Sequence, residues 1–169
     1  RLDIIYQYGG IYLDTDVELL KKPDFLLENQ CYIGIQQPES LCTTGLGFGA
    51  QKSSPVVQKM MECYDSISFT DQKKSTFACP WLNDKVIRSF GKVSNEDITY
   101  LKEVTVYPPR FFDPLSTGNT KNLLCDETVS IHHYAATWAG NKQRWKRKLI
   151  RFFGEDRYFK LKKLFRRVQ

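Results

Sequence analysis

The sequence predicts a mixed α/β fold in which a central sheet is flanked by helices. Segments with the pattern of strands alternate along the chain with segments that have helical periodicity. The length of 169 residues is enough for a sizeable hydrophobic core. A hydrophobic content of 41% with 14% aromatic residues is typical of a globular chain and excludes a disordered one.

The first expected elements are a helix end and three strands. Residues 2–8 are short and amphipathic, as at the end of a helix. The pair Gly9-Gly10 permits a tight entry with positive φ into a strand at 11–14. Residues 31–36 form a second expected strand, and the glycine-rich residues 45–50 form a third.

Two helices and another strand follow. Pro55 begins a helix whose apolar positions recur at helical spacing and predict a packed face. Residues 80–90 form the next helix, with Trp81 among its apolar positions. Residues 104–107 are rich in β-forming side chains and end at a proline pair, which predicts a strand stopped there.

The stretch at residues 8–16, YGGIYLDTD, places two carboxylates at the end of an apolar segment. If residues 11–16 are extended, Tyr12, Asp14 and Asp16 share one face. Carboxylate oxygens are the ligands that Mg²⁺ and Mn²⁺ prefer, often together with substrate phosphates. The motif therefore predicts a metal site, although two acids at a strand end are also common as solvated turn residues.

Both histidines of the chain, His132 and His133, are adjacent in the segment IHHYAATW. Neighbouring residues of a strand point to opposite faces, so at most one of them readily joins Asp16 on a shared ion. The other is expected to be structural.

The run GLGFG at residues 45–49 could be mistaken for a dinucleotide-binding fingerprint. Its spacing differs from Gly-X-Gly-X-X-Gly, and neither Asp65 nor Asp71 supplies a convincing ribose-binding acid. Alternating glycines in a strand instead allow a ligand to approach the backbone closely.

Residues 1–16, RLDIIYQYGGIYLDTD, resemble the DXD signature of a sugar transferase family that includes yeast-type initiating mannosyltransferases and bacterial capsular polysaccharide sugar transferases. The resemblance continues through residues 44–50, 107–112 and 131–138. It implies a GT-A-type nucleotide-diphosphosugar transferase fold, with residues 1–140 as a catalytic domain that lacks its N-terminal nucleotide-binding part.

The same resemblance implies a retaining, metal-dependent transfer of a sugar from a UDP- or GDP-sugar to a glycan or lipid-linked acceptor, in polysaccharide biosynthesis. The implied cofactor is Mn²⁺ or Mg²⁺. The residues to which it gives roles are the metal ligands Asp14, Asp16 and His132, with His133 as the alternative; Arg1 at the donor sugar or phosphate; Tyr12 and Gly10 beside the nucleotide; Thr44 and Gly45 near the donor sugar; and Thr137 and Trp138 at the diphosphate.

Charge is unevenly distributed. Residues 141–169 hold 12 Lys/Arg against 2 Asp/Glu, a net charge of +10, within a chain whose total is +6. Aromatic and aliphatic residues recur among these cations at roughly helical spacing, which predicts a basic amphipathic tail. Such a tail packs on the domain as a solvated helix or contacts an anionic membrane surface; nucleic-acid binding is not expected, because no recognised motif is present. The alternative function is accordingly a non-catalytic basic module that binds a membrane surface or a polyanion.

The cysteine pattern bears on the compartment. The five cysteines are an odd number without a Cys-X-X-Cys pair, which disfavours both a zinc site and a regular disulfide framework. No stretch reaches the roughly 18 to 20 apolar residues that a membrane-spanning helix requires. We therefore expect a cytoplasmic protein, with peripheral contact at the inner face of the membrane through the basic tail.

Overall fold

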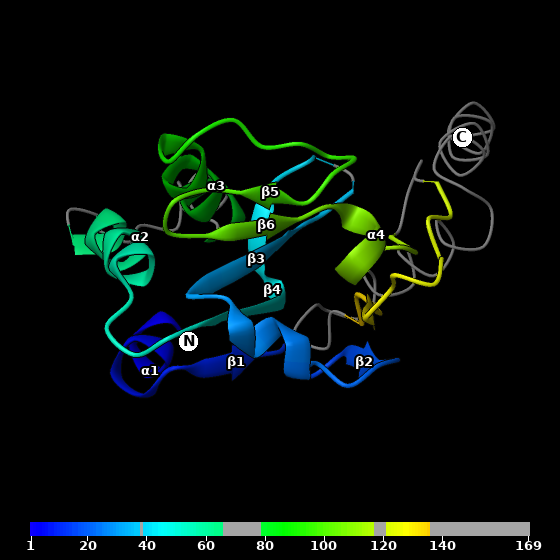
Figure 1. Cartoon of the computed structure of the whole chain (residues 1–169), viewed down its shortest axis with the longest axis horizontal. Coiled ribbons are helices and arrows are strands. Elements are labelled where there is room, and N and C mark those ends of the chain that lie inside the picture. Colours follow the sequence, from blue (N-terminus) through cyan, green and yellow to red (C-terminus); the bar gives the residue numbers. More distant parts are fainter. Residues whose placement is uncertain (38, 66–78, 117–120, 136–169) are drawn as a thin grey trace, which may run out of the picture.

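The computed structural model describes residues 1–37, 39–65, 79–116 and 121–135 (Figure 1). In this part of the chain the strands form a mixed five-stranded sheet and a separate two-stranded sheet. All neighbouring strands are antiparallel except β3 and β6, which are parallel. In spatial order the large sheet contains β1 (Gly10–Tyr12), β4 (Cys42–Ala50), β3 (Cys31–Ile35), β6 (Thr105–Tyr107) and β5 (Thr99–Tyr100), and the small sheet pairs β2 (Val17–Leu19) with β7 (Ser130–His132).

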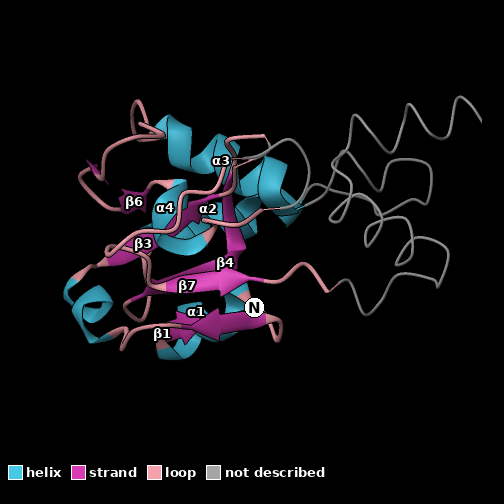
Figure 2. Ribbon diagram, turned by 90° about the vertical axis from the view of Figure 1, so that its right-hand side faces the viewer, coloured by secondary structure: helices cyan, strands magenta, loops and turns pink. Residues whose placement is uncertain are grey.

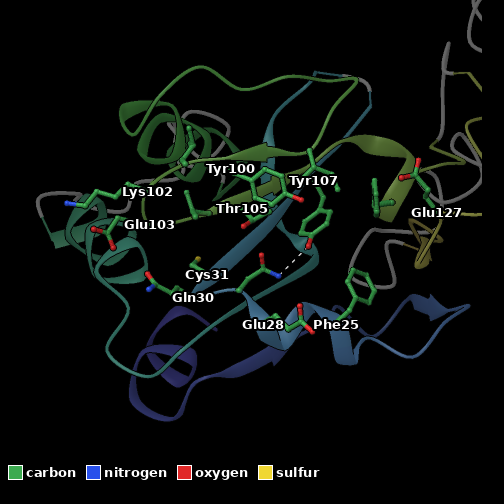
Figure 3. Close-up of a pocket in the computed structure, with 15 residues that line it drawn as sticks. Phe25, Glu28, Gln30, Cys31, Tyr100, Lys102, Glu103, Thr105, Tyr107 and Glu127 are labelled. Carbon is green, nitrogen blue, oxygen red and sulfur yellow. Dashed lines mark hydrogen bonds between the residues drawn. The ribbon is translucent and has the colours of Figure 1, made fainter.

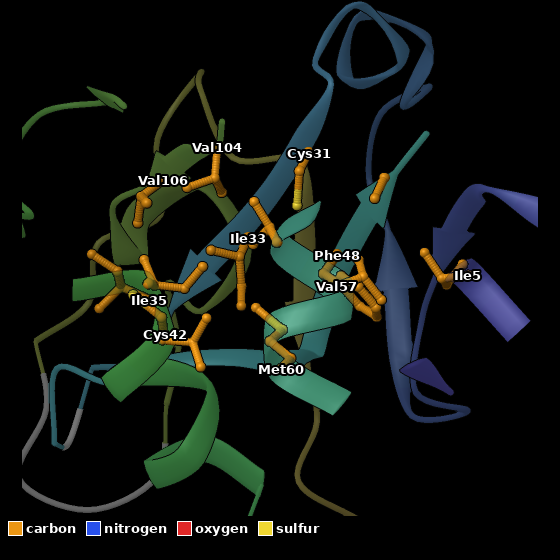
Figure 4. Packing of buried hydrophobic residues seen from close by; sticks show 14 residues of the cluster. Ile5, Cys31, Ile33, Ile35, Cys42, Phe48, Val57, Met60, Val104 and Val106 are labelled. Atoms are coloured by element: carbon orange, nitrogen blue, oxygen red, sulfur yellow. The ribbon is translucent and has the colours of Figure 1, made fainter. Parts of the chain in front are cut away.

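Three helices contribute to the core on one face of the large sheet: α1 (Leu2–Tyr8), α2 (Pro55–Asp65) and α3 (Cys79–Ser89). The alternate β3 residues Ile33 and Ile35 belong to this core, as the period of two in a strand requires. Val57 and Met60 of α2 lie against them in Figure 4. The valine and methionine positions of this helix are therefore core, as the helical spacing predicts.

A second, aromatic core covers the other face. It includes Tyr32 of β3, Phe112 of α4 (Pro109–Phe112) and Leu26 of the 3₁₀ helix η1 (Asp24–Glu28). The rings of Tyr32 and Phe112 are stacked with their centroids 5.9 Å apart. The large sheet consequently lies between two apolar layers, which fixes the ends of its strands firmly enough to position a site.

An irregularity in β4 interrupts its pairing with β3. Ile33 is opposite Phe48, but the next residue, Gly34, is opposite Thr43. The β4 residues between these pairs include Gly47, whose φ of +136° favours glycine. Irregularities of this kind commonly redirect side chains beside functional sites.

The expected α/β class is confirmed, and the main strands and helices lie where the patterns predict them. The expected third strand is longer than predicted, because it begins at Cys42. Gly9 and Gly10 have the expected positive φ values of 70° and 107°. Trp81, one of the apolar positions of the expected helix at 80–90, is exposed on α3.

The short elements β2, η1, β5 and α4 have no counterpart among the expected ones, and the strand expected at the two histidines is β7, which ends at His132. All five cysteines are free. In the described ranges no helix combines the length and apolar character needed to span a membrane.

Candidate metal centre

The two carboxylates of the Asp-X-Asp motif lie at a turn. Strand β1 ends at Tyr12, and the N–H of Val17 donates to the Asp14 carbonyl oxygen over 3.1 Å. The expectation of an extended segment through Asp16 is therefore wrong, because this turn interrupts it. Tyr12 still lies on the side of Asp14, since its hydroxyl donates to Asp14 Oδ1 over 2.9 Å.

His132 reaches the turn through the small sheet. Strand β7, labelled in Figure 2, pairs with β2. The register of this pairing places His132 opposite Val17, next in sequence to Asp16. Its Nε2 lies 3.3 Å from Asp16 Oδ1 and 3.7 Å from Asp14 Oδ2. Among the described residues these three side chains offer ligand atoms within 4.8 Å of one another, so they could hold one metal ion.

His133 points elsewhere. Its Nε2 lies 2.8 Å from Glu18 Oε2, and its backbone N–H donates to the carbonyl oxygen of Asp16 over 2.9 Å. The expectation that the two rings diverge is confirmed. In this arrangement His132 joins the two aspartates, and the His133 ring contacts Glu18 of β2 instead.

Arg1 and Gly45 define the space around Asp14. A guanidinium nitrogen of Arg1 lies 3.3 Å from Asp14 Oδ1 and 3.5 Å from the Thr44 hydroxyl. The guanidinium also lies over the Tyr12 ring, 4.7 Å from its centroid. A Cβ at Gly45 would come within 2.7 Å of Asp14 Oδ2, so only a residue without a side chain leaves this carboxylate in its present position.

Partial burial, with a contribution from the neighbouring Asp14, raises the pKa of Tyr12. The phenol therefore stays protonated at neutral pH and remains a hydrogen-bond donor to the Asp14 carboxylate.

Backbone groups fix the orientation of His132 and Asp16. The N–H of Tyr134 donates to His132 Nδ1 over 3.1 Å, and the N–H of Ala135 donates to Asp16 Oδ2 over 2.8 Å. Because Nδ1 accepts, a neutral His132 ring carries its proton on Nε2, facing the carboxylates. Binding of a cation through Nε2 requires that proton to leave and Nδ1 to be protonated instead, which displaces the Tyr134 N–H.

A buried carboxylate anchors the segment that contains His132. The Tyr134 hydroxyl donates to Asp113 Oδ2 over 2.8 Å, and the Gln37 N–H donates to the same oxygen over 2.8 Å. The Tyr134 ring meets His132 edge to face, with centroids 4.2 Å apart. Burial raises the pKa of Asp113 to about 6. The sequence gives no sign of this role, because Asp113 and Tyr134 become neighbours only in the fold.

A cavity of about 350 Å³ adjoins Arg1 and Thr44. Asn83 of α3 lines it, is fully buried, and donates from Nδ2 to the Thr44 hydroxyl over 3.3 Å. Within the described part of the chain its Oδ1 has no hydrogen-bond partner. Asn83 was missed in the sequence, where the available signal was a polar residue at helical spacing from Val86 and Ile87.

One of the other expected site residues, Gly10, is not brought to the cluster. Gly10 begins β1 and lines a separate cavity of about 260 Å³. Thr137 and Trp138 lie outside the described residues, as does the basic segment 141–169.

The donor set fits a divalent cation. Two carboxylates and one imidazole, all partly exposed, leave further coordination positions open. Oxygen donors suit Mg²⁺ and Mn²⁺, and the imidazole favours Mn²⁺ of the two. A hydrogen bond and a salt bridge to Asp14 already hold one of the acids in place.

The stretch that carries both aspartates has a counterpart among known protein families. Residues 1–33 match the family model of a glycosyltransferase sugar-binding region containing a DXD motif. No curated protein and no solved structure gives a significant match to the chain. The family match supports a DXD glycosyltransferase without specifying the subtype, and the mixed sheet with its helices is compatible with a GT-A-like fold.

Proposed function

We propose that the chain is the catalytic part of a metal-dependent, retaining glycosyltransferase. It would transfer a sugar from a UDP- or GDP-sugar to a glycan or lipid-linked acceptor in polysaccharide biosynthesis. The observation that supports this most strongly is the convergence of Asp14, Asp16 and His132, because two of these residues lie in the family-matched stretch and the third comes from the far end of the described chain.

Asp14, Asp16 and His132 would hold Mn²⁺ or Mg²⁺. When bound, the cation supplies positive charge that stabilises a departing nucleoside diphosphate. Thr137 and Trp138 are proposed to contact the same diphosphate.

Arg1 links the metal centre to the adjoining cavity. It contacts Asp14 and Thr44, and it lines the 350 Å³ cavity together with Asn83. A cavity of this size accommodates a small ligand, so we place the donor sugar there. Arg1 would orient the donor, and the unpaired Asn83 Oδ1 offers an acceptor for a hydroxyl group.

Nucleotide binding tests the proposal. Titration calorimetry of the full-length protein with UDP and GDP is expected to show binding in the presence of Mn²⁺, and loss of that binding in EDTA or in Asp16→Ala. Glu18→Ala is the matched control, because it removes a neighbouring carboxylate that pairs with His133 and lies outside the cluster. If neither nucleotide binds with Mn²⁺ present, the enzyme assignment is wrong and the basic interaction module replaces it.

The basic tail is proposed to hold the enzyme at an anionic membrane surface, where lipid-linked acceptors are found. Its net charge of +10 supports this role.

A further inference from the structure

Another cavity, different from the two described above, lies at the opposite end of the large sheet from the metal centre. Its volume is about 560 Å³. It is lined by η1, by the start of β3 at Cys31, by α4 and by the β5–β6 hairpin at 99–107, and we refer to it as the hairpin cavity (Figure 3). Cys31 is paired with Ala50, whereas the Asp14 N–H is bonded to Gly45 near the other end of β4.

Aromatic rings form much of its lining. Tyr100 and Phe25 are 75% and 40% exposed, although both are large side chains that a folded protein usually covers. Tyr107 points from β6 toward η1 in Figure 3 and meets the Phe25 ring edge to face, with centroids 6.4 Å apart. Phe111 adds a further aromatic surface. Tyr107 and Phe111 are each only 5% exposed and belong to the aromatic core, so Tyr100 and Phe25 are the rings that offer flat apolar faces to a ligand.

Polar groups at the same cavity are mostly acceptors. Within the described chain, the side-chain carboxylates of Glu28 and Glu103 form neither a hydrogen bond nor an ion pair, so their oxygens remain available to a ligand. The third carboxylate, Glu127, is paired with Arg110 over 2.6 Å. Lys102 is the one cationic side chain among the lining residues. The excess of carboxylates disfavours phosphates, and therefore a second nucleotide site.

We propose that the hairpin cavity binds a neutral oligosaccharide. A sugar ring has an apolar face of C–H groups, which suits Tyr100 and Phe25, and a rim of hydroxyl donors, which suits Glu28 and Glu103. The oligosaccharide would be part of the acceptor, held away from the bond that is formed. This assignment to an acceptor rests on the proposed function, whereas the binding itself does not.

Saturation-transfer NMR with three neutral trisaccharides, mannotriose, maltotriose and triacetylchitotriose, tests the proposal without metal or nucleotide. We expect at least one of them to bind, with an affinity that does not change with salt. Tyr100→Ala is expected to lower that affinity about tenfold through loss of one aromatic contact. Trp81→Ala, which removes another exposed aromatic side chain away from this cavity, is expected to leave it unchanged.

Glu103→Gln provides a second variant that alters only a lining carboxylate, and weaker trisaccharide binding is expected there as well. Spermidine serves as a cationic control ligand in the same experiment. The proposal is overturned if no trisaccharide binds, whether or not spermidine does, or if Tyr100→Ala binds the trisaccharide like the wild type.

Asp16→Ala separates this proposal from the transferase assignment. If Asp16→Ala and the wild type both bind the trisaccharide while the wild type binds neither UDP nor GDP, only the transferase assignment fails. If the wild type binds a nucleotide but no trisaccharide, only the hairpin cavity site fails.

Discussion

A side chain at position 45 would occupy the space that the Asp14 carboxylate needs. In Gly45→Ala the new Cβ would lie 2.7 Å from Asp14 Oδ2, so the carboxylate must move away. We expect the affinity for Mn²⁺ to fall about tenfold, as for other changes to groups that orient a metal ligand. The free energy of unfolding is expected to change by about 1 kcal/mol or less. Mn²⁺ titration and urea unfolding measure the two effects.

Gly34→Ala is the matched control, because its Cβ would lie 2.8 Å from Cδ2 of Phe112 in the aromatic core. It is expected to cost about 1 to 3 kcal/mol of stability through overpacking, with Mn²⁺ affinity unchanged. Equal Mn²⁺ affinities in Gly45→Ala and the wild type would show that Asp14 does not bind the metal from its present position.

The buried Asp113 predicts a pH-dependent stability. Its pKa is raised from 3.8 to about 6 in the folded protein, so the folded state binds the proton more tightly than the unfolded state. Stability is therefore expected to fall as the pH rises from about 4 to about 6, by about 3 kcal/mol from this group. Asp113→Asn removes the titration. The difference in free energy of unfolding between wild type and variant, measured in urea across this range, is expected to shift in favour of the variant as the pH rises. Parallel curves would contradict the assignment.

The segment around β7 is held from two sides. Its strand pairs with β2, and Tyr134, two residues after His132, donates a hydrogen bond to Asp113. Tyr134→Phe keeps the ring against His132 and removes this hydrogen bond. We expect a loss of about 1 to 3 kcal/mol in stability and a several-fold loss in Mn²⁺ affinity, because a buried carboxylate loses a donor and the segment loosens. Tyr100→Phe, on an exposed tyrosine, is expected to change neither quantity. Unchanged Mn²⁺ affinity in Tyr134→Phe would mean that strand pairing alone positions His132.

Elements with a distinct local pattern could be predicted from the sequence, including the three-residue strands β1 and β6, and elements without one could not. Strand β3 has a continuous apolar run, and α2 has apolar residues at helical spacing, so each pattern identifies its element. Strands β2 and β7 have no distinct pattern that sets their bounds, which are defined only by the pairing of the two strands with each other. That pairing selects His132 over His133, a choice that alternation alone leaves open. The turn at Asp14 likewise depends on its long-range contact with Gly45.

At the scale of the whole molecule, charge separates residues 1–140, with a net charge of −4, from the tail at 141–169, with a net charge of +10. Lys160→Gln, Lys162→Gln and Lys163→Gln combined remove three positive charges from the tail. If it contacts anionic lipid, affinity for phosphatidylserine-containing vesicles is expected to fall about a hundredfold, at about 1 kcal/mol per charge. The matched triple variant replaces the exposed Lys22, Lys52 and Lys92, outside the tail, and is expected to bind as the wild type does. Vesicle sedimentation measures both, and equal losses in the two variants would indicate a nonspecific charge effect.

The central claim is that residues from opposite ends of the described part of the chain form one metal centre. Mn²⁺ titration of the wild type, His132→Ala and His133→Ala, followed by electron paramagnetic resonance, tests it most directly, because the two variants remove adjacent and chemically identical side chains. His132→Ala is expected to lower Mn²⁺ affinity at least about tenfold through loss of a ligand, while His133→Ala changes it by less than about threefold. Equal effects of the two substitutions, or no effect of His132→Ala, would contradict the account.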